Sequence, residues 1–164
     1  MASQMIMSSH AGLTFMYRVG GILIHDDRLL VEWNAAGDFC FVPGGRVEYG
    51  ETAPAALRRE AKEELGESVR VARLLAAADN LFVLDGRRYQ EISLYFLMEL
   101  DAKSRLRARD GLFEGTEPGN RFEWIPVATL ERARLMPPFL RELIGDLPEA
   151  PVYIARNELD STPP

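Results

Sequence analysis

The sequence has one cysteine, two histidines and no long apolar segment. A single cysteine, Cys40, cannot form an intramolecular disulfide, and it disfavours a zinc site built on thiolates. The apolar runs fall far short of the roughly 20 residues that cross a bilayer, so we expect no membrane span. The first residues also lack the basic segment and apolar stretch of a signal peptide. These absences together predict a cytoplasmic protein.

The chain also has no excess of basic side chains over acidic ones. The chain carries 19 Lys and Arg against 25 Asp and Glu, which gives a formal charge of −6. Binding to a nucleic-acid backbone needs a basic surface, so a nucleic-acid partner is disfavoured. Small acidic substrates are not excluded, because a bound metal ion can supply positive charge.

No repeat and no Pro- or Ser-rich linker divides the 164 residues. This length is typical of one domain, and the 47% hydrophobic content argues against a disordered chain. We therefore expect a single domain over residues 13–155. Residues 1–12 and 156–164 are expected to be tails.

Apolar and β-branched runs predict several strands, in the ranges 15–25, 29–31, 39–42, 69–84 and 89–100. Asp26-Asp27 and Asp85-Gly86 separate neighbouring strands and are typical of hairpin turns. Residues 105–120 are charged and Gly-rich, which indicates a long loop. Strands combined with helices predict an α/β (α+β) protein with a mixed sheet covered by helices.

Residues 52–65 are predicted to form a helix, because small and apolar side chains recur every four residues at Ala53, Leu57, Ala61 and Leu65. Thr52 is placed to cap this helix, and Pro54 is tolerated in its first turn. Gly66 is placed to end the helix, because glycine readily adopts the left-handed conformation that follows a helix. A second helix is expected within residues 127–145, interrupted by Pro137-Pro138.

Three glutamates share the predicted helix with this apolar stripe. At about 100° per residue, Glu64 falls inside the apolar arc, Glu60 at its edge and Glu63 just outside it. A buried carboxylate is unfavourable unless something compensates its charge. A hard divalent cation such as magnesium would do so, since it prefers oxygen ligands. The alternative is an ordinary solvated acidic face of a helix.

The loop before this helix contains Gly44, Gly45 and Gly50. Glycines allow unusual backbone torsions and close approach of a ligand, and amides that lead into a helix can face an anion. A site for an anion next to a site for a cation is the arrangement that a metal-bound pyrophosphate requires.

Residues 44–66 read GGRVEYGETAPAALRREAKEELG, and this segment resembles the Nudix box, whose family pattern is G-x5-E-x7-R-E-U-x-E-E-x-G-U with U aliphatic. The fixed positions of the pattern are matched by Gly45, Glu51, Arg59, Glu60, Glu63, Glu64 and Gly66. The departures are at aliphatic positions, where Ala61 is small and Glu67 is charged.

The resemblance implies a Nudix-type α/β/α sandwich with a mixed β-sheet between helices. It also implies a metal-dependent pyrophosphohydrolase that uses Mg²⁺ or Mn²⁺. The expected substrates are small nucleoside diphosphate derivatives, such as nucleoside triphosphates or nucleotide sugars like ADP-ribose. A homodimer is expected because dimers are common in this family.

The family's site residues carry over to matching positions. Glu60, Glu63 and Glu64 would bind the metal, and either Glu63 or Glu60 would help to deprotonate the attacking water. Arg59 would pair with Glu51 and hold the loop against the helix. The backbone of Gly44 and Gly45 would contact substrate or metal.

A further carboxylate from a late loop joins the metal site in several relatives. Glu117 is our candidate here, with Glu114 and Glu123 as rivals. On the substrate side, Arg46 is a candidate phosphate contact, and Glu48 is placed to reach a metal through water.

Residues that recognise the base are less constrained by the sequence. Candidates for stacking or hydrogen bonding to a base are Phe15, Tyr17, Trp33, Phe39, Asn80, Phe82, Tyr89 and Glu91. Further candidates for phosphate binding are Arg18, Arg87 and Arg88. Packing in the core and surface charge are the competing interpretations of these side chains.

Other functions remain open on the same scaffold. A nucleotide sensor without catalytic activity is the main alternative, and it would bind nucleotides without releasing phosphate. An isomerase or a decapping-type enzyme is a third hypothesis, which the acidic charge disfavours.

Overall fold

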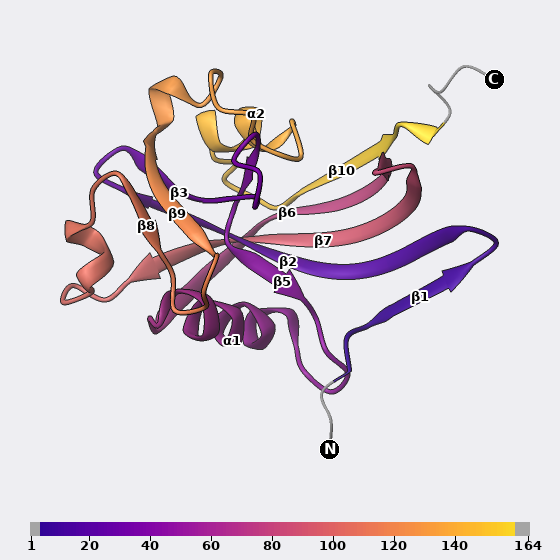
Figure 1. Cartoon of the computed structure of the whole chain (residues 1–164), viewed down its shortest axis with the longest axis horizontal. Helices are drawn as coiled ribbons and strands as arrows, with labels where there is room; N and C mark the ends of the chain where they lie inside the picture. Colours follow the sequence, from indigo (N-terminus) through magenta and orange to yellow (C-terminus); the bar gives the residue numbers. More distant parts are fainter. Residues whose placement is uncertain (1–3, 160–164) are drawn as a thin grey trace.

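The computed structural model describes residues 4–159, and its strands join into one mixed sheet (Figure 1). The strands are β1 Met7–His10, β2 Leu13–His25, β3 Arg28–Trp33, β4 Cys40–Phe41, β5 Gly44–Arg46, β6 Val69–Leu84, β7 Arg87–Leu100, β8 Leu112–Glu114, β9 Arg121–Pro126 and β10 Val152–Asn157. The helices are α1 Ala53–Leu65 and α2 Leu140–Gly145, with short 3₁₀ turns η1 Arg105–Ala108 and η2 Val127–Thr129.

Strand β2 is the centre of the sheet. It runs parallel to β7 along the whole register from Leu13↔Arg88 to Leu23↔Met98. It is also antiparallel to β1, β3 and β5. The order of the main path is β10-β6-β7-β2-β3-β9-β8. This mixed sheet confirms the predicted fold class.

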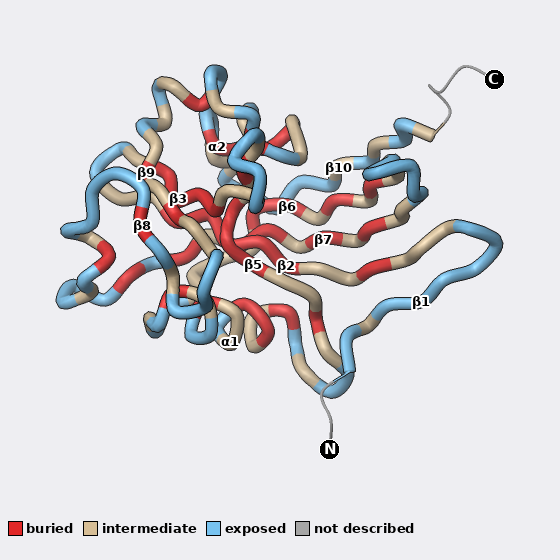
Figure 2. The backbone as a smooth tube through the Cα atoms, in the orientation of Figure 1, coloured by how far each residue is buried: buried red, intermediate tan, exposed pale blue. Residues whose placement is uncertain are grey.

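The two helices lie on opposite sides of the central strands (Figure 1). Strand β2 contributes side chains to the core on both faces of the sheet, because alternate side chains of a strand point to opposite faces. Val19 and Leu23 pack in the cluster that contains the apolar stripe of α1. Ile22 packs in the other cluster, with Leu140 and Leu143 of α2. Figure 2 shows this burial concentrated in the central strands and the inner side of α1.

Helix α1 has nearly the predicted limits. It begins at Ala53 after Thr52, which occupies the cap position without a side-chain cap bond. It ends at Gly66, whose φ of 70° lies in the left-handed region and whose N–H donates to the carbonyl of Lys62. The apolar stripe is buried as predicted, so α1 holds its glutamates at a fixed angle to the sheet.

The hairpin turns are also confirmed. Asp26 and Asp27 have φ of 49° and 55°, and Asp85 and Gly86 have φ of 50° and 72°. Two successive residues in the left-handed region make the type of turn whose twist matches the flanking strands.

The predicted tails are wrong in part. Residues 7–10 of the expected N-terminal tail form β1, an edge strand paired with β2. All of its residues are exposed, so no apolar alternation could mark it in the sequence. At the other end, β10 continues to Asn157 and passes the expected boundary at residue 155. The outermost residues of both predicted tails, 1–3 and 160–164, lie outside the described residues.

The helical stretch expected within residues 127–145, interrupted by Pro137-Pro138, forms only at its two ends, as the short η2 and as α2, which begins after the two prolines. The segment between them joins β4 instead, because Cys40 N–H donates to the carbonyl of Arg134 and its carbonyl accepts from Met136 N–H. The expected loop over residues 105–120 likewise contains η1 and β8. Across the described part of the chain, no helix is long and apolar enough to cross a membrane.

Candidate functional site

The glycine loop meets helix α1 at Gly45. This residue lies in β5, opposite Val19 of β2. A Cβ atom at this position would overlap with the carboxylate of Glu60. A larger residue at this position would therefore displace the Glu60 carboxylate, which lies directly on the backbone of the loop.

Arg59 ties the same loop to the helix. Its Nη2 donates to Oε1 of Glu51 over 2.7 Å, and its Nε donates to Oε2 over 3.3 Å. Nη2 also donates to the carbonyl of Arg46 at 3.1 Å. The hydrogen bond from Arg59 lowers the pKa of Glu51, and the pKa of Arg59 is raised in return. This pair joins the residues that the box pattern places eight positions apart.

The guanidinium of Arg59 also contacts two of the expected metal ligands. Its Nη1 donates to Oε1 of Glu60 at 3.0 Å and to Oε2 of Glu63 at 3.1 Å. Among residues 4–159, no three acidic, histidine or cysteine side chains converge closely enough to hold an ion. Arg59 therefore neutralises Glu60 and Glu63 in this structure.

Glu64 lies apart from this ion-pair group. Its Oε2 is buried and has no hydrogen-bond partner. Burial, together with the negative charges of Glu32, Glu60 and Glu117, raises the pKa of Glu64 to about 9, although the charge of Arg18 opposes the shift. A buried carboxylate without a partner is costly, so this position calls for a positive charge or a proton.

Glu32 of β3 is the residue that the sequence analysis missed. Its side chain is buried, with 7% of the residue exposed. Its pKa is raised to about 7, mainly by burial and also by the charges of Glu60 and Glu117, while the charge of Arg18 opposes the shift. The one signal in the sequence is a charged residue directly after the apolar run of residues 29–31.

Glu32, Glu60, Glu64 and Glu117 form what we call the acid cluster, because their charges act on one another. Glu117 reaches it because Thr116 N–H donates to the carbonyl of Glu64 at 2.7 Å, which fastens the loop after β8 to α1. The two rivals of Glu117 lie elsewhere. Glu114 is exposed at the end of β8, and Glu123 accepts a hydrogen bond from the indole of Trp33 at 2.9 Å.

The acid cluster has the donor type that a hard divalent cation prefers, although within residues 4–159 its side chains do not converge closely enough to hold one in this arrangement. Its donors are carboxylate oxygens, the ligands that magnesium and manganese prefer. The unpartnered Oε2 of Glu64 is the observation that favours such an ion, because a buried acceptor is otherwise satisfied.

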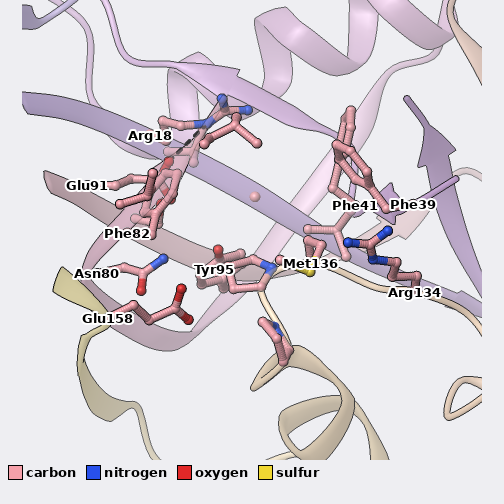
Figure 3. Close-up of a pocket in the computed structure, with 18 residues that line it drawn as sticks. Arg18, Phe39, Phe41, Asn80, Phe82, Glu91, Tyr95, Arg134, Met136 and Glu158 are labelled. Atoms are coloured by element: carbon pink, nitrogen blue, oxygen red, sulfur yellow. Dashed lines mark hydrogen bonds and ion pairs between the residues drawn. The ribbon is translucent and has the colours of Figure 1, made fainter. Parts of the chain in front are cut away.

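A cavity of about 420 Å³ opens over β2, β6 and β7. Its far wall comes from Phe39, Phe41 and Val42 in and next to β4, and from Met136 and the two prolines that follow it. Figure 3 shows Arg18 facing Glu91 at one end and Phe39 and Phe41 at the other. Arg18 Nε lies 3.9 Å from Glu91 Oε2. We call this space the sheet cavity.

Arg18 connects the sheet cavity with the acid cluster. It lines the cavity, and its charge also lowers the pKa of Glu32, Glu60 and Glu64. A ligand that extends along Arg18 would therefore have one end in the cavity and the other near the acids.

The sheet cavity brings together some of the predicted base-binding residues and leaves others out. Those that line it are Phe39, Asn80, Phe82 and Glu91. Tyr89 stacks on Phe82, with ring centroids 5.3 Å apart. Tyr17 packs with the core on the α1 side, and Trp33 donates to Glu123, so neither lines the cavity.

The remaining candidates on the sheet and the loop also lie outside the cavity lining. Phe15 belongs to the β1–β2 arm, and Arg87 and Arg88 are exposed next to the β6–β7 turn. Arg46 contacts Met5, and its Nε is buried without a partner. Glu48 Oε2 lies 3.9 Å from Arg59 Nε, within the ion-pair group.

Solved structures of similar fold support this arrangement of strands and helices. A mutator MutT protein from Bacillus halodurans has a TM-score of 0.57 and 17% identity, and the match covers 80% of each chain. A NUDIX hydrolase from Nitrosomonas europaea has a TM-score of 0.55 and 19% identity, covering 79% of this chain and 86% of that one. An ADP-ribose pyrophosphatase from Streptococcus suis has a TM-score of 0.52 and 14% identity, and the match covers 84% of this chain and 98% of that one.

No curated protein matches the chain. The family model described as NUDIX domain matches residues 14–147, which is most of the chain and includes α1, its glycine loop and all four members of the acid cluster. The chain therefore belongs to the NUDIX domain family and, as the sequence predicts, is a Nudix hydrolase acting on phosphoanhydride bonds.

Proposed function

We infer that this chain is a metal-dependent pyrophosphohydrolase that cleaves the phosphoanhydride of nucleoside diphosphate derivatives. The observation that carries this proposal is the buried, unpartnered carboxylate of Glu64 within the acid cluster. Arg18, whose charge acts on Glu64, also lines the sheet cavity, which we assign to the nucleoside.

Glu60, Glu63 and Glu64 are the proposed metal ligands, with the backbone of Gly45 and the loop residue Glu117 beside them. A bound Mg²⁺ or Mn²⁺ would neutralise charge on the phosphate oxygens and lower the pKa of a bound water. The donor set favours these cations because it contains only oxygen.

Arg59 has a positioning role in this proposal. Its two bonds to Glu51 fix the loop, while its single bonds to Glu60 and Glu63 offset their mutual repulsion when no cation is present. Those single bonds are the ones that a cation would replace. The pair with Glu51 would stay in place and keep the helix aligned with the loop.

Glu63 or Glu60 is proposed to accept the proton of the attacking water. Glu63 is the more accessible of the two, since 49% of its side chain is exposed against 14% for Glu60. On the substrate side, Gly44 would contribute its backbone, Arg46 a phosphate contact, and Glu48 a contact to metal-bound water.

The proposed substrates are nucleoside triphosphates or nucleotide sugars. A similar fold in a protein named as an ADP-ribose pyrophosphatase is compatible with the second class. A cytoplasmic location and a homodimer stay predictions.

A panel of nucleoside triphosphates and nucleotide sugars, incubated with Mg²⁺, tests the proposal. We expect a mononucleotide product, loss of activity with a chelator and recovery with Mn²⁺. The sensor hypothesis predicts saturable binding in calorimetry without any product. Glu149→Gln, an exposed change far from the site, is the matched control for Glu64→Gln.

A further inference from the structure

We propose that the sheet cavity selects a guanine-type base, through Asn80 and Glu91 on neighbouring strands. This inference rests on the proposed function and names the substrate class of the same site.

The floor of the cavity is one face of three adjacent strands. Asn80 of β6 lies directly opposite Glu91 of β7 in the register, and Ala78 lies opposite Ser93. On β2, Gly20 shares this face, because a Cβ there would overlap with the ring of Tyr95. Small residues next to larger polar ones leave a hollow on this face, deep enough to bury a ring.

Asn80 is a polar group placed for a ligand. Only 6% of the residue is exposed, and its Oδ1 is buried without a hydrogen-bond partner. A buried amide oxygen without a partner costs free energy, and native proteins rarely leave one. A ligand that offers an N–H or an O–H at this position would satisfy it.

Glu91 is held as an acceptor. It is 8% exposed, and the hydroxyl of Ser93 donates to its Oε1 at 2.6 Å. Its Oε2 lies 3.9 Å from Arg18 Nε, which is too long for a hydrogen bond. The carboxylate therefore has a fixed orientation and free lone pairs on both oxygens.

A carboxylate with two free acceptor sites matches one base best. Guanine presents two adjacent N–H donors, at N1 and at the exocyclic amine, and both can bond to one carboxylate. Adenine and cytosine place a ring nitrogen acceptor beside their amine, which would face the carboxylate with a lone pair. Uracil has a single N–H between two carbonyls. The Asn80 amide adds a further polar contact on the same edge.

The rest of the cavity agrees with this orientation. The far wall is apolar, with Phe39, Phe41 and Met136, and it would cover the faces of a planar ring. Arg18 lies beside Glu91, with its Nε 3.9 Å from Oε2, and so lines the edge of the proposed base site. Because the ribose is attached at N9, across the ring from N1 and the exocyclic amine, a guanine edge on Glu91 would direct the ribose and phosphates away from Glu91.

Calorimetry on the metal-free protein tests the inference with GMP, IMP, AMP and UMP. IMP lacks only the exocyclic amine of GMP, so it isolates one of the two donors. We expect GMP to bind at least tenfold more tightly than IMP, AMP or UMP. Equal binding of GMP and IMP, or tighter binding of AMP, would overturn the proposal.

Glu91→Gln replaces one acceptor oxygen with a donor. The ratio of the affinities for GMP and IMP should therefore fall to nearly one. Asn80→Ala should weaken the binding of GMP at least fivefold. Glu149→Gln should leave the affinity for every nucleotide unchanged. An unchanged preference in Glu91→Gln would contradict the assignment. Hydrolysis of other nucleotides without any preference for guanine would reject this inference alone, whereas no hydrolysis of any nucleotide would reject the proposed function.

Discussion

Arg59 and Glu51 form a two-point ion pair, with Nη2 2.7 Å from Oε1 and Nε 3.3 Å from Oε2. The same Oε1 of Glu51 accepts from the backbone N–H of Glu48 at 2.9 Å. One carboxylate thus fixes both the helix side chain and the fold of the loop. The glycine loop and the acid cluster depend on this pair for their relative position.

Arg59→Lys should weaken this connection, because an ammonium cannot reproduce the planar two-point contact. We expect the free energy of unfolding to fall by about 1–2 kcal/mol, near the lower end for hydrogen bonds to charged groups since Arg59 is partly exposed. Urea denaturation measures the change. Arg58→Lys, an exposed neighbour on the same helix, is the control and should have no effect. Equal stability of the two variants would contradict the role given to Arg59.

Glu64→Gln and Glu63→Gln should each lower turnover at least a hundredfold while the fold survives. Glu64→Gln replaces a carboxyl that burial keeps protonated at neutral pH with a neutral side chain of similar size, so the metal-free protein should melt at nearly the same temperature. Glu63→Gln loses a bond to Arg59 on an exposed side chain and should change the melting temperature little. Turnover near that of the original chain in both variants would reject the site.

The sequence located α1 and its glutamates because local features determine them. The apolar stripe orients the helix, Gly66 ends it, and the box spacing identifies the acids. Glu32 could not be found this way, since only the order of strands in the sheet brings β3 beside α1. The pairing of Cys40 with residues 134–136 is likewise a long-range contact, and it replaced the helix expected there.

The proposed base-binding residues show a similar limit. The sequence predicts Asn80 and Glu91 as two of several candidate base contacts, both on one hairpin, but it does not distinguish them from the other candidates. Their register across β6 and β7 places them opposite each other, and the turn at Asp85-Gly86 determines that register. The apolar wall that covers them comes from segments that are distant in sequence, so no local pattern could indicate the cavity.

Glu32→Gln tests whether the missed acid belongs to the site. Removing its charge relieves repulsion with the other acids of the cluster, so the metal-free protein should become more stable. Its affinity for Mg²⁺ should fall about tenfold or more, as for residues that support metal ligands. Calorimetry with Mg²⁺ alone measures this affinity. An unchanged affinity would remove Glu32 from the proposed site.

Gly45→Ala should separate folding from activity. The added Cβ would collide with the carboxylate of Glu60, the far end of a flexible side chain, so that side chain can move and the fold should survive. A displaced Glu60 should lower turnover at least tenfold. Gly145→Ala is the matched control, because a Cβ there has no neighbour within 4 Å. Normal turnover in Gly45→Ala would show that the position of Glu60 does not matter.

Cys40 gives a prediction of pH dependence away from the acid cluster. Burial and, to a smaller extent, the charge of Glu123 raise the pKa of its thiol from 9.0 to about 11. The unfolded chain therefore loses this proton first as pH rises, so stability from Cys40 is complete below pH 9 and declines towards pH 11. The decline should reach about 2–3 kcal/mol in the free energy of unfolding.

Urea denaturation between pH 8 and pH 11 measures this decline, and Cys40→Ala supplies the reference because it cannot titrate. The variant should be less stable at pH 8, since it leaves space at a fully buried position. The difference between the two proteins should then shrink as pH rises, because only the original chain has a thiol to deprotonate. A constant difference over the whole range would show that the thiol keeps its ordinary pKa in the folded protein.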